Sequence, residues 1–533
     1  MKRCPECRRD YADETLNFCL DDGAALLDGP RSFEDAGEAT KLLPEGISGS
    51  AGNSYERTRI FSNAANSIAI LPFVNMSADA ENEFFCDGLS EELLNALTKI
   101  ESLKVAARTS AFSFKGTNTK VSEIGEALGV NTILEGSVRK AGERVRIMVQ
   151  IVNAEDGYHL WSERYDREMN DIFAVQDEIT LAVVEALKVK VLQSERSAML
   201  KKATDDPEAY QLYLRGRAFW NRRTPADFEK AIGYFERAII IDAKYSLAYC
   251  GLTDCYTLLA YFEEVAPHVL REKARVSALK AIELDEASAE SHTSMAMYNL
   301  IFEFDLASAE HHFKKAVGLN PRLVTAQYLY GTHLATQRRF DEAFRRGRIA
   351  LELDPLSGPL NGNVARALYI AGRYEDAIEL AEKNLELAPN FFFTHWVLGV
   401  SYRQIRNFEK ALDHLRKAVS LSGIFALKGD LGVALAVAGR DAEARELLTE
   451  LEAESKTRYV SPQWPAVIYA ALGEKGTALQ YLAKAWEVRA IQLLWIGVDP
   501  NFDPLRSEPE FIDLLDKSGI DGNAPSLSSS VEQ

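Results

Sequence analysis

A fixed step of 34 residues recurs in the second half of this chain. Four alanines lie one step apart, at Ala309, Ala343, Ala377 and Ala411. Three prolines keep the same step, at Pro321, Pro355 and Pro389. A period of this length is typical of a unit of two antiparallel helices, which can bury its apolar face only by stacking on the next unit. The period therefore predicts an all-α solenoid for the larger part of the chain.

The most regular unit adds further small and apolar positions to this step. It reads His395-x2-Leu398-Gly399-x2-Tyr402 and continues to Ala411, Leu415 and Ala418. This spacing resembles the tetratricopeptide repeat (TPR), with histidine in the place of the usual tryptophan. The resemblance implies about eight repeats over residues 206–520 and an extended surface that binds other proteins.

Charge and composition limit what the rest of the chain can do. The chain has 533 residues, a formal net charge of −18 and 47% hydrophobic residues. So acidic a chain lacks the basic surface that is needed to bind the phosphates of nucleic acids or an anionic membrane. No apolar run is long enough to span a membrane, and the N-terminus has no apolar signal core. We expect a cytoplasmic protein whose six cysteines stay reduced.

Five segments follow from shifts in composition along the chain. Residues 1–27 are short and rich in cysteine, and residues 28–66 form a flexible linker of Gly, Ser, Ala and Asn. Residues 67–200 alternate strand and helix patterns, residues 206–520 hold the repeats, and residues 521–533 are a disordered polar tail. The expected fold class is α+β multidomain: a zinc ribbon, an α/β domain and an all-α TPR solenoid.

The α/β segment has clear local signals. We expect strands at 67–74 and 103–107, a helix capped by Ser90, a helix at 121–128 closed by Gly129, a hairpin over 132–152 and a long helix over 171–192. The segment resembles the TolB amino-terminal-like domain of bacterial regulatory proteins. The resemblance is carried by SIAILPF (67–73), DGLSEE (87–92), ARTS (107–110), LEGSVR (134–139) and GYHLWSERYD (157–166). It implies a signalling context and no activity of its own.

The first 27 residues look like a zinc ribbon. Cys4-x2-Cys7 has the spacing of one metal knuckle, and Cys19 begins the second. Asp22 stands three residues after Cys19, where a fourth ligand belongs, and zinc accepts carboxylate oxygen in a tetrahedral site. A segment this small has little core, which favours one structural zinc ion. The alternative is a degenerate knuckle without metal.

No catalytic motif is found in the sequence, so we expect no enzymatic activity. A small anion is the candidate ligand at the ends of the first two predicted strands, near helix N-termini. The candidate residues are Asp87, Gly88, Ser90, Arg108, Thr109 and Ser110. The alternative is structural: Ser90 and Thr109 cap helices, and Arg108 pairs with an acid.

Partner proteins are expected on the concave face of the repeats. We expect the first helix of each unit to expose large aromatic and arginine side chains there, and these residue types are enriched at binding hot spots. The candidates are Tyr328, Asn363, Arg366, Tyr369, Phe393, Trp396 and Arg403. The alternative for Phe393 and Trp396 is packing between neighbouring hairpins.

The sequence is best interpreted as a cytoplasmic, non-enzymatic scaffold or adaptor in bacterial signalling. A second hypothesis is a ligand sensor, in which the α/β domain binds a small anion and the repeats relay the change. A third is a transcription-linked factor that uses the ribbon on nucleic acid.

Overall fold

The computed structural model describes residues 66–79, 82–142, 144–168, 172–262, 265–422, 424 and 427–518, and six strand residues before them. The chain divides into two units, residues 1–59 and 60–533, which are described separately. In the first unit, β1 (Lys2–Arg3) pairs antiparallel with β2 (Asp10–Tyr11) and β3 (Leu27–Asp28). The strand order of this small sheet is β2-β1-β3.

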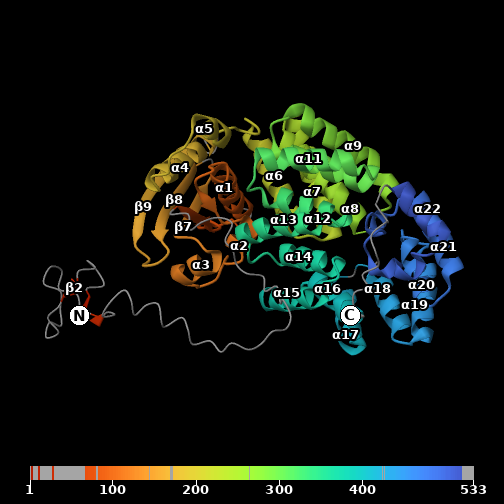
Figure 1. The fold of residues 1–533 in the computed structure, drawn as a ribbon. Helices are drawn as coiled ribbons and strands as arrows, with labels where there is room; N and C mark the ends of the chain where they lie inside the picture. The colour runs from red at the N-terminus through yellow and green to blue at the C-terminus, as the bar shows by residue number, and fades with distance from the viewer. Residues whose placement is uncertain are drawn as a thin grey trace. The chain divides into compact units, whose positions relative to one another are not determined.

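The second unit begins with a six-stranded mixed sheet (Figure 1). Its strands are β4 (Ser67–Ile70), β5 (Val74–Asn75), β6 (Lys104–Val105), β7 (Thr132–Ala141), β8 (Arg144–Asn153) and β9 (His159–Glu168). The order is β6-β4-β7-β8-β9, and β5 also pairs with β7. Strands β4, β5 and β6 join by parallel pairing, whereas β7, β8 and β9 are antiparallel neighbours.

Helices cover both faces of this sheet. Ile68 and Ile70 of β4 pack with α1 (Asn82–Leu97) and α4 (Ile172–Ala186) in one apolar cluster. Ala69, which points the other way, packs with α3 (Val121–Leu128) in a second cluster. The alternation of buried side chains along a strand thus places one helical layer on each side.

Most expected elements of this segment are confirmed, with two corrections. The 132–152 hairpin is present, and Gly129 closes α3 with φ of +61°. The first helix begins at Asn82 rather than at Ser90. Ser90 caps nothing, because its hydroxyl accepts a hydrogen bond from the Phe73 amide and donates one to the Cys86 carbonyl. The long helix ends at Ala186, and α5 (Gln193–Met199) follows as a separate helix.

From residue 207 to residue 487 the described chain forms eight helical hairpins in succession (Figure 1). The first four are α6 (Pro207–Trp220) with α7 (Pro225–Ile241), α8 (Ser246–Tyr261) with α9 (Pro267–Leu284), α10 (Ala289–Tyr298) and η3 (Asn299–Glu303) with α11 (Leu306–Leu319), and α12 (Val324–Thr336) with α13 (Phe340–Leu353). The last four are α14 (Gly358–Ile370) with α15 (Tyr374–Leu387), α16 (Phe392–Gln404) with α17 (Phe408–Ser422), α18 (Leu427–Val437) with α19 (Asp441–Glu454), and α20 (Gln463–Ala471) with α21 (Lys475–Glu487).

The periodic small residues lie where the two helices of a hairpin meet. Ala309, Ala343, Ala377 and Ala411 are all buried. At Gly399 a Cβ atom would lie only 2.5 Å from the Leu415 side chain, so glycine is required by the close approach of α16 and α17. These positions keep the 34-residue period because larger side chains would separate the helices.

The position usually held by tryptophan has a recurring hydrogen-bonding role in this chain. Its side chain bonds to the carbonyl oxygen six residues earlier, that of the periodic proline. The pairs are Gln327 with Pro321, Asn361 with Pro355, and His395 with Pro389. Gln, Asn and His can each donate this bond, which explains why polar residues are accepted there.

Three further helical segments follow the last hairpin: η4 (Ile491–Trp495), η5 (Pro500–Leu505) and α22 (Pro509–Ser518). Phe502, Leu505 and Phe511 are fully buried, and they belong to the same apolar cluster as the repeats. The sequence after residue 490 therefore leaves the repeat pattern but stays part of the solenoid core.

Candidate functional site

The first helices of the hairpins present the residues expected to bind partner proteins. The expectation that these side chains are exposed is wrong for three of them: Arg366, Tyr369 and Arg403 are 5%, 1% and 4% exposed. Tyr328, Asn363, Phe393 and Trp396 are partly buried. The physical reason is that other parts of the same chain pack against this face.

Asp430 of α18 is the centre of a polar network on this inner face. Its carboxylate accepts hydrogen bonds from Trp396 Nε1 at 2.7 Å and from Asn501 Nδ2 at 2.9 Å. Arg403 Nη1 lies 3.8 Å from the same carboxylate, and Arg403 Nη2 donates to the Tyr369 hydroxyl at 3.2 Å. The buried charges of Arg403 and Asp430 thus compensate each other, as buried ions must.

Arg366 of α14 is held in a similar way. Its guanidinium lies 4.3 Å from the centre of the Trp495 ring and donates to the Tyr261 hydroxyl. Trp495 comes from η4 and Tyr261 from α8, so segments far apart in the sequence meet at this arginine. Phe393 and Trp396 stack within α16 with their ring centres 5.1 Å apart. The Trp396 ring also lies 6.4 Å from that of Tyr369 in α14, so Trp396 packs between neighbouring hairpins, as the alternative proposed.

A second carboxylate next to this network has an unusual acidity. Burial, together with the negative charge of Asp430, raises the pKa of Asp499 to about 7. Asp499 caps η5 by accepting a hydrogen bond from the Asn501 amide at 2.9 Å, and Arg403 partly offsets the rise. Ionising Asp499 at neutral pH therefore costs folding free energy.

The residues expected to bind an anion all meet protein groups. Lys115 Nζ bonds to Asp87 at 2.6 Å, and Arg108 Nε donates to Glu91 Oε2 at 2.7 Å. A Cβ atom on Gly88 would lie 2.3 Å from Leu214, so glycine here allows α1 to approach α6. Arg108 thus pairs with an acid, as the structural alternative proposed. Anion binding by these residues stays a prediction.

Ser110 joins the α/β domain to the repeats. Its amide and its hydroxyl both donate to Asp354 Oδ1, at 2.8 and 2.6 Å, and its hydroxyl accepts from the Leu356 amide at 2.8 Å. Ser110 lies at the start of α2 (Arg108–Phe112), and Asp354 ends α13. Burial raises the pKa of Asp354, whereas the Ser110 hydrogen bonds lower it. The sheet domain and the fourth hairpin are therefore connected by buried, directional bonds.

Two arginines add to this junction between the α/β domain and the repeats. Arg217 of α6 approaches the Glu91 carboxylate at 3.4 Å. The Arg322 guanidinium donates to the carbonyl oxygens of Ile100, Glu101 and Leu103. These contacts join residues more than a hundred positions apart, so no local pattern predicts them.

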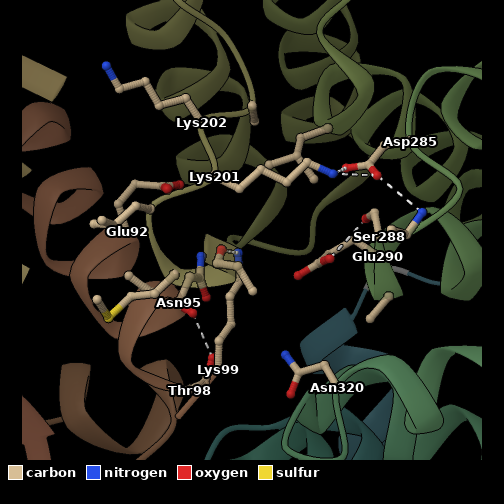
Figure 2. Close-up of a pocket in the computed structure, with 18 of the residues that line it drawn as sticks. Glu92, Asn95, Thr98, Lys99, Lys201, Lys202, Asp285, Ser288, Glu290 and Asn320 are labelled. Carbon is tan, nitrogen blue, oxygen red and sulfur yellow. Dashed lines mark hydrogen bonds and ion pairs between the residues drawn. The ribbon is translucent and has the colours of Figure 1, made fainter. Parts of the chain in front are cut away.

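A cavity of about 690 Å³ opens at the same junction. Figure 2 shows Glu92 of α1 and Lys99 of the turn after it on one side, and Asp285, Ser288 and Glu290 on the other. Lys201 and Lys202, from the segment that joins the two domains, lie along its edge. We did not expect this site from the sequence. Glu92 stands in the DGLSEE motif, but nothing in the sequence brings it near residues 285–290.

The predicted metal ligands Cys4, Cys7, Cys19 and Asp22 lie outside the described residues. Among the residues that are described, no group of three or more His, Cys, Asp or Glu side chains is placed to hold a metal ion. Zinc binding at the N-terminus stays a prediction.

Two kinds of family model match the chain. Residues 305–357 and 394–424 match tetratricopeptide repeat models, which confirms the repeats. Residues 64–182 match the second domain of HilA/YgeH-like transcriptional regulators. That is a different assignment from the TolB-like domain we expected, and the TolB likeness is not shown.

The named relatives include a putative adenylate cyclase and a transcriptional regulator. The chain is 38% identical over 253 residues to "Putative adenylate cyclase 3" of Rhizobium meliloti (strain 1021), an alignment that covers 46% of this chain and 42% of the relative. It is 21% identical over 322 residues to the transcriptional regulator HilA of Salmonella typhimurium, covering 60% of this chain and 56% of the relative. The chain thus spans about half the length of the curated relatives it matches.

Solved structures give partial matches. PilW, a widely conserved type IV pilus biogenesis factor, is 19% identical and is covered to 92%, with 40% of this chain and a TM-score of 0.32. YrrB, a TPR protein with an unusual peptide-binding site, is 23% identical and is covered to 94%, with 36% of this chain and a TM-score of 0.25. Across the described residues, no helix is both long and apolar enough to cross a membrane.

Proposed function

We propose that this protein is a non-enzymatic scaffold or adaptor in bacterial signalling that binds partner proteins through its repeats. The supporting observation is the unbroken series of eight hairpins, in which two stretches match tetratricopeptide repeat models. Stacked repeats of this kind present a large surface to other proteins and contain no reactive group of their own. The regulatory names of the relatives are consistent with a role in signalling.

A partner at Arg366, Trp396 and Arg403 would have to replace contacts that the chain makes with itself. Trp495 covers Arg366, and Asn501 shares Asp430 with Trp396. Binding at this face therefore requires residues 495–501 to move away first. Substitutions at Trp495 and Asn501 test this more cleanly than substitutions at Trp396 or Arg403, which remove the binding residues themselves.

The test compares proteins captured by the tagged full chain with those captured by the Trp495→Ala and Asn501→Ala variants. Asn501→Ala removes one side chain of the network and leaves the aromatic packing in place. We expect more of the same partners on both variants, with melting temperatures recorded for each. If the variants are folded and capture the same partners as the wild type, the binding surface lies elsewhere on the protein. If neither the wild-type chain nor the variants capture a specific partner, the scaffold proposal is contradicted.

The absence of enzymatic activity is part of the proposal, although one relative is named as an adenylate cyclase. The sequence has no phosphate-cradling or nucleophile–base motif to support catalysis. Formation of cyclic nucleotides by the purified chain is the direct test. Turnover that survives repurification and is lost on Asp87→Asn substitution contradicts the proposal.

A transcription-linked role is the second candidate, favoured by the match of residues 64–182 to the HilA/YgeH-like domain. With a net charge of −18, such a role would act through protein contacts rather than through a basic DNA-binding surface. Enrichment of RNA polymerase subunits in the captured material supports this role. Their absence leaves the scaffold without a link to transcription.

We also propose that residues 1–27 bind one zinc ion through Cys4, Cys7, Cys19 and Asp22. The expected result is one zinc per chain in the wild type and its loss in the Cys4→Ser variant, measured by elemental analysis. A Cys86→Ser variant is the matched control, because Cys86 is a buried thiol of α1 far along the sequence. Equal zinc in Cys4→Ser and wild type contradicts the site.

A further inference from the structure

The junction cavity is lined by segments that are distant in the sequence. Its walls come from α1, from α4 and α5, from the segment that joins the two domains, and from α6, α8 and α10. The volume of about 690 Å³ lies in the range of small-molecule sites. An occupant would therefore touch the α/β domain and the first repeats at once.

Cations that line the cavity are already engaged by protein groups. Lys201 forms an ion pair with Asp285 at 2.6 Å, and Lys99 Nζ donates to the Ala198 carbonyl at 3.0 Å. Lys202 lies 5.5 Å from the centre of the Phe173 ring. Arg322 is taken up by three carbonyl oxygens. An anionic ligand would have to compete for each of these groups.

Carboxylates outnumber cations in the lining, six to four, and Glu92 and Glu290 lie on opposite sides of the cavity. Within the described part of the chain, Glu92 has no hydrogen-bond or ion-pair partner. Among the described residues, Glu290, on the opposite side in Figure 2, accepts a hydrogen bond only from the Ser288 hydroxyl. Burial and the nearby charges of Glu91 and Glu290 raise the pKa of Glu92 to about 7. The positive charges of Lys99 and Arg217 only partly offset this rise, so Glu92 lies in a place that disfavours its charge.

Apolar and aromatic groups complete the walls. Tyr210 and Tyr245 are buried, and Phe173 and Leu247 lie beside them. Such groups favour contact with the hydrocarbon part of a ligand, while a few polar groups fix its orientation. The lining therefore suits a ligand that has a charged end and an aliphatic body.

We propose that this cavity binds a small organic cation with an alkylammonium group, and that Glu92 is its counter-ion with Glu290 on the opposite wall. An ammonium group would give Glu92 a direct ion pair, which none of the described residues provides, and the aliphatic part would pack on the tyrosines. A metal ion is disfavoured, because the described residues bring no three potential ligands together. This site goes beyond the proposed scaffold function and does not depend on it.

The bound cation would connect α1 to α10. Glu92 belongs to the helix that supports the sheet, and Glu290 belongs to the third hairpin. Binding would draw the two carboxylates toward one charge and strengthen the junction already made by Ser110 and Asp354. The ligand would in this way be detected as increased stability of the whole second unit.

The experiment is calorimetric titration of the full chain with 1,4-diaminobutane and n-butylamine, and with butane-1,4-diol as the uncharged analogue of equal length. We expect the amines to bind and the diol not to bind. Glu92→Gln should weaken amine binding at least tenfold, and Glu290→Gln should weaken it less. Glu126→Gln is the matched control, since Glu126 is an exposed residue of α3 outside the cavity.

The alkylammonium group could belong to a free small molecule or to a lysine side chain of another protein. Titration with a lysine tripeptide whose ends are blocked distinguishes the two. Binding of the free amines alone identifies a small molecule as the ligand, whereas binding of the tripeptide alone identifies a lysine side chain of another protein and overturns the small-molecule assignment. Equal binding of diol and diamine overturns the proposal, and so does unchanged affinity in folded Glu92→Gln and Glu290→Gln variants. Partner capture is measured separately, so failure here leaves the scaffold proposal untouched.

Discussion

The interior of each hairpin and the inner face of the solenoid are built from different chemistry. Between α16 and α17, Gly399, Ala411 and Leu415 meet in an apolar contact that depends on volume. A short distance away on α16, Arg403 and Trp396 take part in a buried polar network with Asp430. The face of α16 that packs on α17 therefore accepts only small side chains, whereas its inner face buries charged groups that must be paired.

The two faces also differ in how far their contacts reach along the chain. Gly399 and Leu415 belong to one repeat, so each repeat of the period can reproduce their contact. Asp430 and Asn501 are 71 residues apart, and Asn501 lies beyond the last hairpin. A contact of this range has no periodic signature. The 34-residue period therefore predicts the contacts inside each hairpin, but it does not predict which segments cover the inner face.

Removing the centre of the polar network should have the largest effect. Asp430→Ala leaves the buried Arg403 without its countercharge and removes the acceptor for Trp396, so we expect a loss of about 3–5 kcal/mol in the free energy of unfolding. Urea denaturation measures the loss. Asp413→Ala, at an exposed position of α17, is the control and should change stability by less than about 0.5 kcal/mol. A loss below about 1 kcal/mol for Asp430→Ala would show that the network is not essential to the inner face.

Asp499 tests the same face through pH. Because its folded-state pKa of about 7 exceeds the ordinary value of 3.8, the folded state binds a proton that the unfolded state has already released. The contribution of Asp499 to stability therefore falls as pH rises from about 4 to 7 and is constant above that. Asp499→Asn keeps the cap of η5 and should be more stable than the wild type at pH 8, by roughly 1–3 kcal/mol. Parallel pH profiles of the two proteins would contradict this assignment.

Hairpin interiors should respond to volume instead. Gly399→Ala places a methyl group 2.5 Å from Leu415, and we expect a loss of about 1–3 kcal/mol. Gly233→Ala in α7 is the matched control, since a Cβ there meets nothing within 4 Å. That change should raise stability by up to about 1 kcal/mol through helix propensity. Equal effects at the two glycines would mean that the packing of α16 on α17 is looser than described.

Histidine pairs inside two hairpins provide the smallest and sharpest test. His292 Nδ1 lies 2.8 Å from His312 Nδ1, and His395 Nδ1 lies 2.9 Å from His414 Nδ1. Burial, with the charge of His292, lowers the pKa of His312 to about 4. At the histidines the unfolded state therefore binds more protons between pH 6.5 and 4, and their contribution to stability falls as pH falls through that range.

We expect the His292–His312 pair to account for roughly 1–2 kcal/mol of this acid loss. The pKa values of His395 and His414 are also lowered by burial, so that pair should act in the same direction. Chemical denaturation of the His312→Asn and His414→Asn double variant should give a flatter profile below pH 6.5. The profile above pH 7 should keep the same shape as that of the wild type. A double variant as acid-sensitive as the wild type would exclude the histidines as the cause.

Parts of the fold could be predicted because their signals are local. Gly129 ends α3 since only a left-handed backbone closes the helix there, and the alternation from Val145 to Ile151 reports one buried face of β8. Ser90 was misread for the same reason. A serine before an apolar run is typical of a helix cap, but the helix begins earlier, at Asn82. The Ser90 hydroxyl instead accepts a hydrogen bond from the Phe73 amide, between β4 and β5.

The candidate sites could be predicted less well, because they depend on which segments meet. Arg366, Tyr369 and Arg403 were correctly placed on the first helices of their hairpins, yet Trp495, Tyr261 and Asp430 bury them. Ser110 was expected to face a ligand and instead bonds to Asp354, 244 residues later. The same polar side chain can serve either purpose, and only its neighbours decide which.

The sequence by itself determined the repeat, the hairpin interiors and the local order of strands and helices, because period, small residues and turn residues act over distances of a few tens of residues. The tertiary structure alone decided that residues 495–501 cover the inner face, that Ser110 joins Asp354, and that Glu92 lines a cavity with Glu290. Long-range contacts of this kind arise when whole elements pack. Burial then sets the charge state and the partners of each polar group, which the order of residues does not encode.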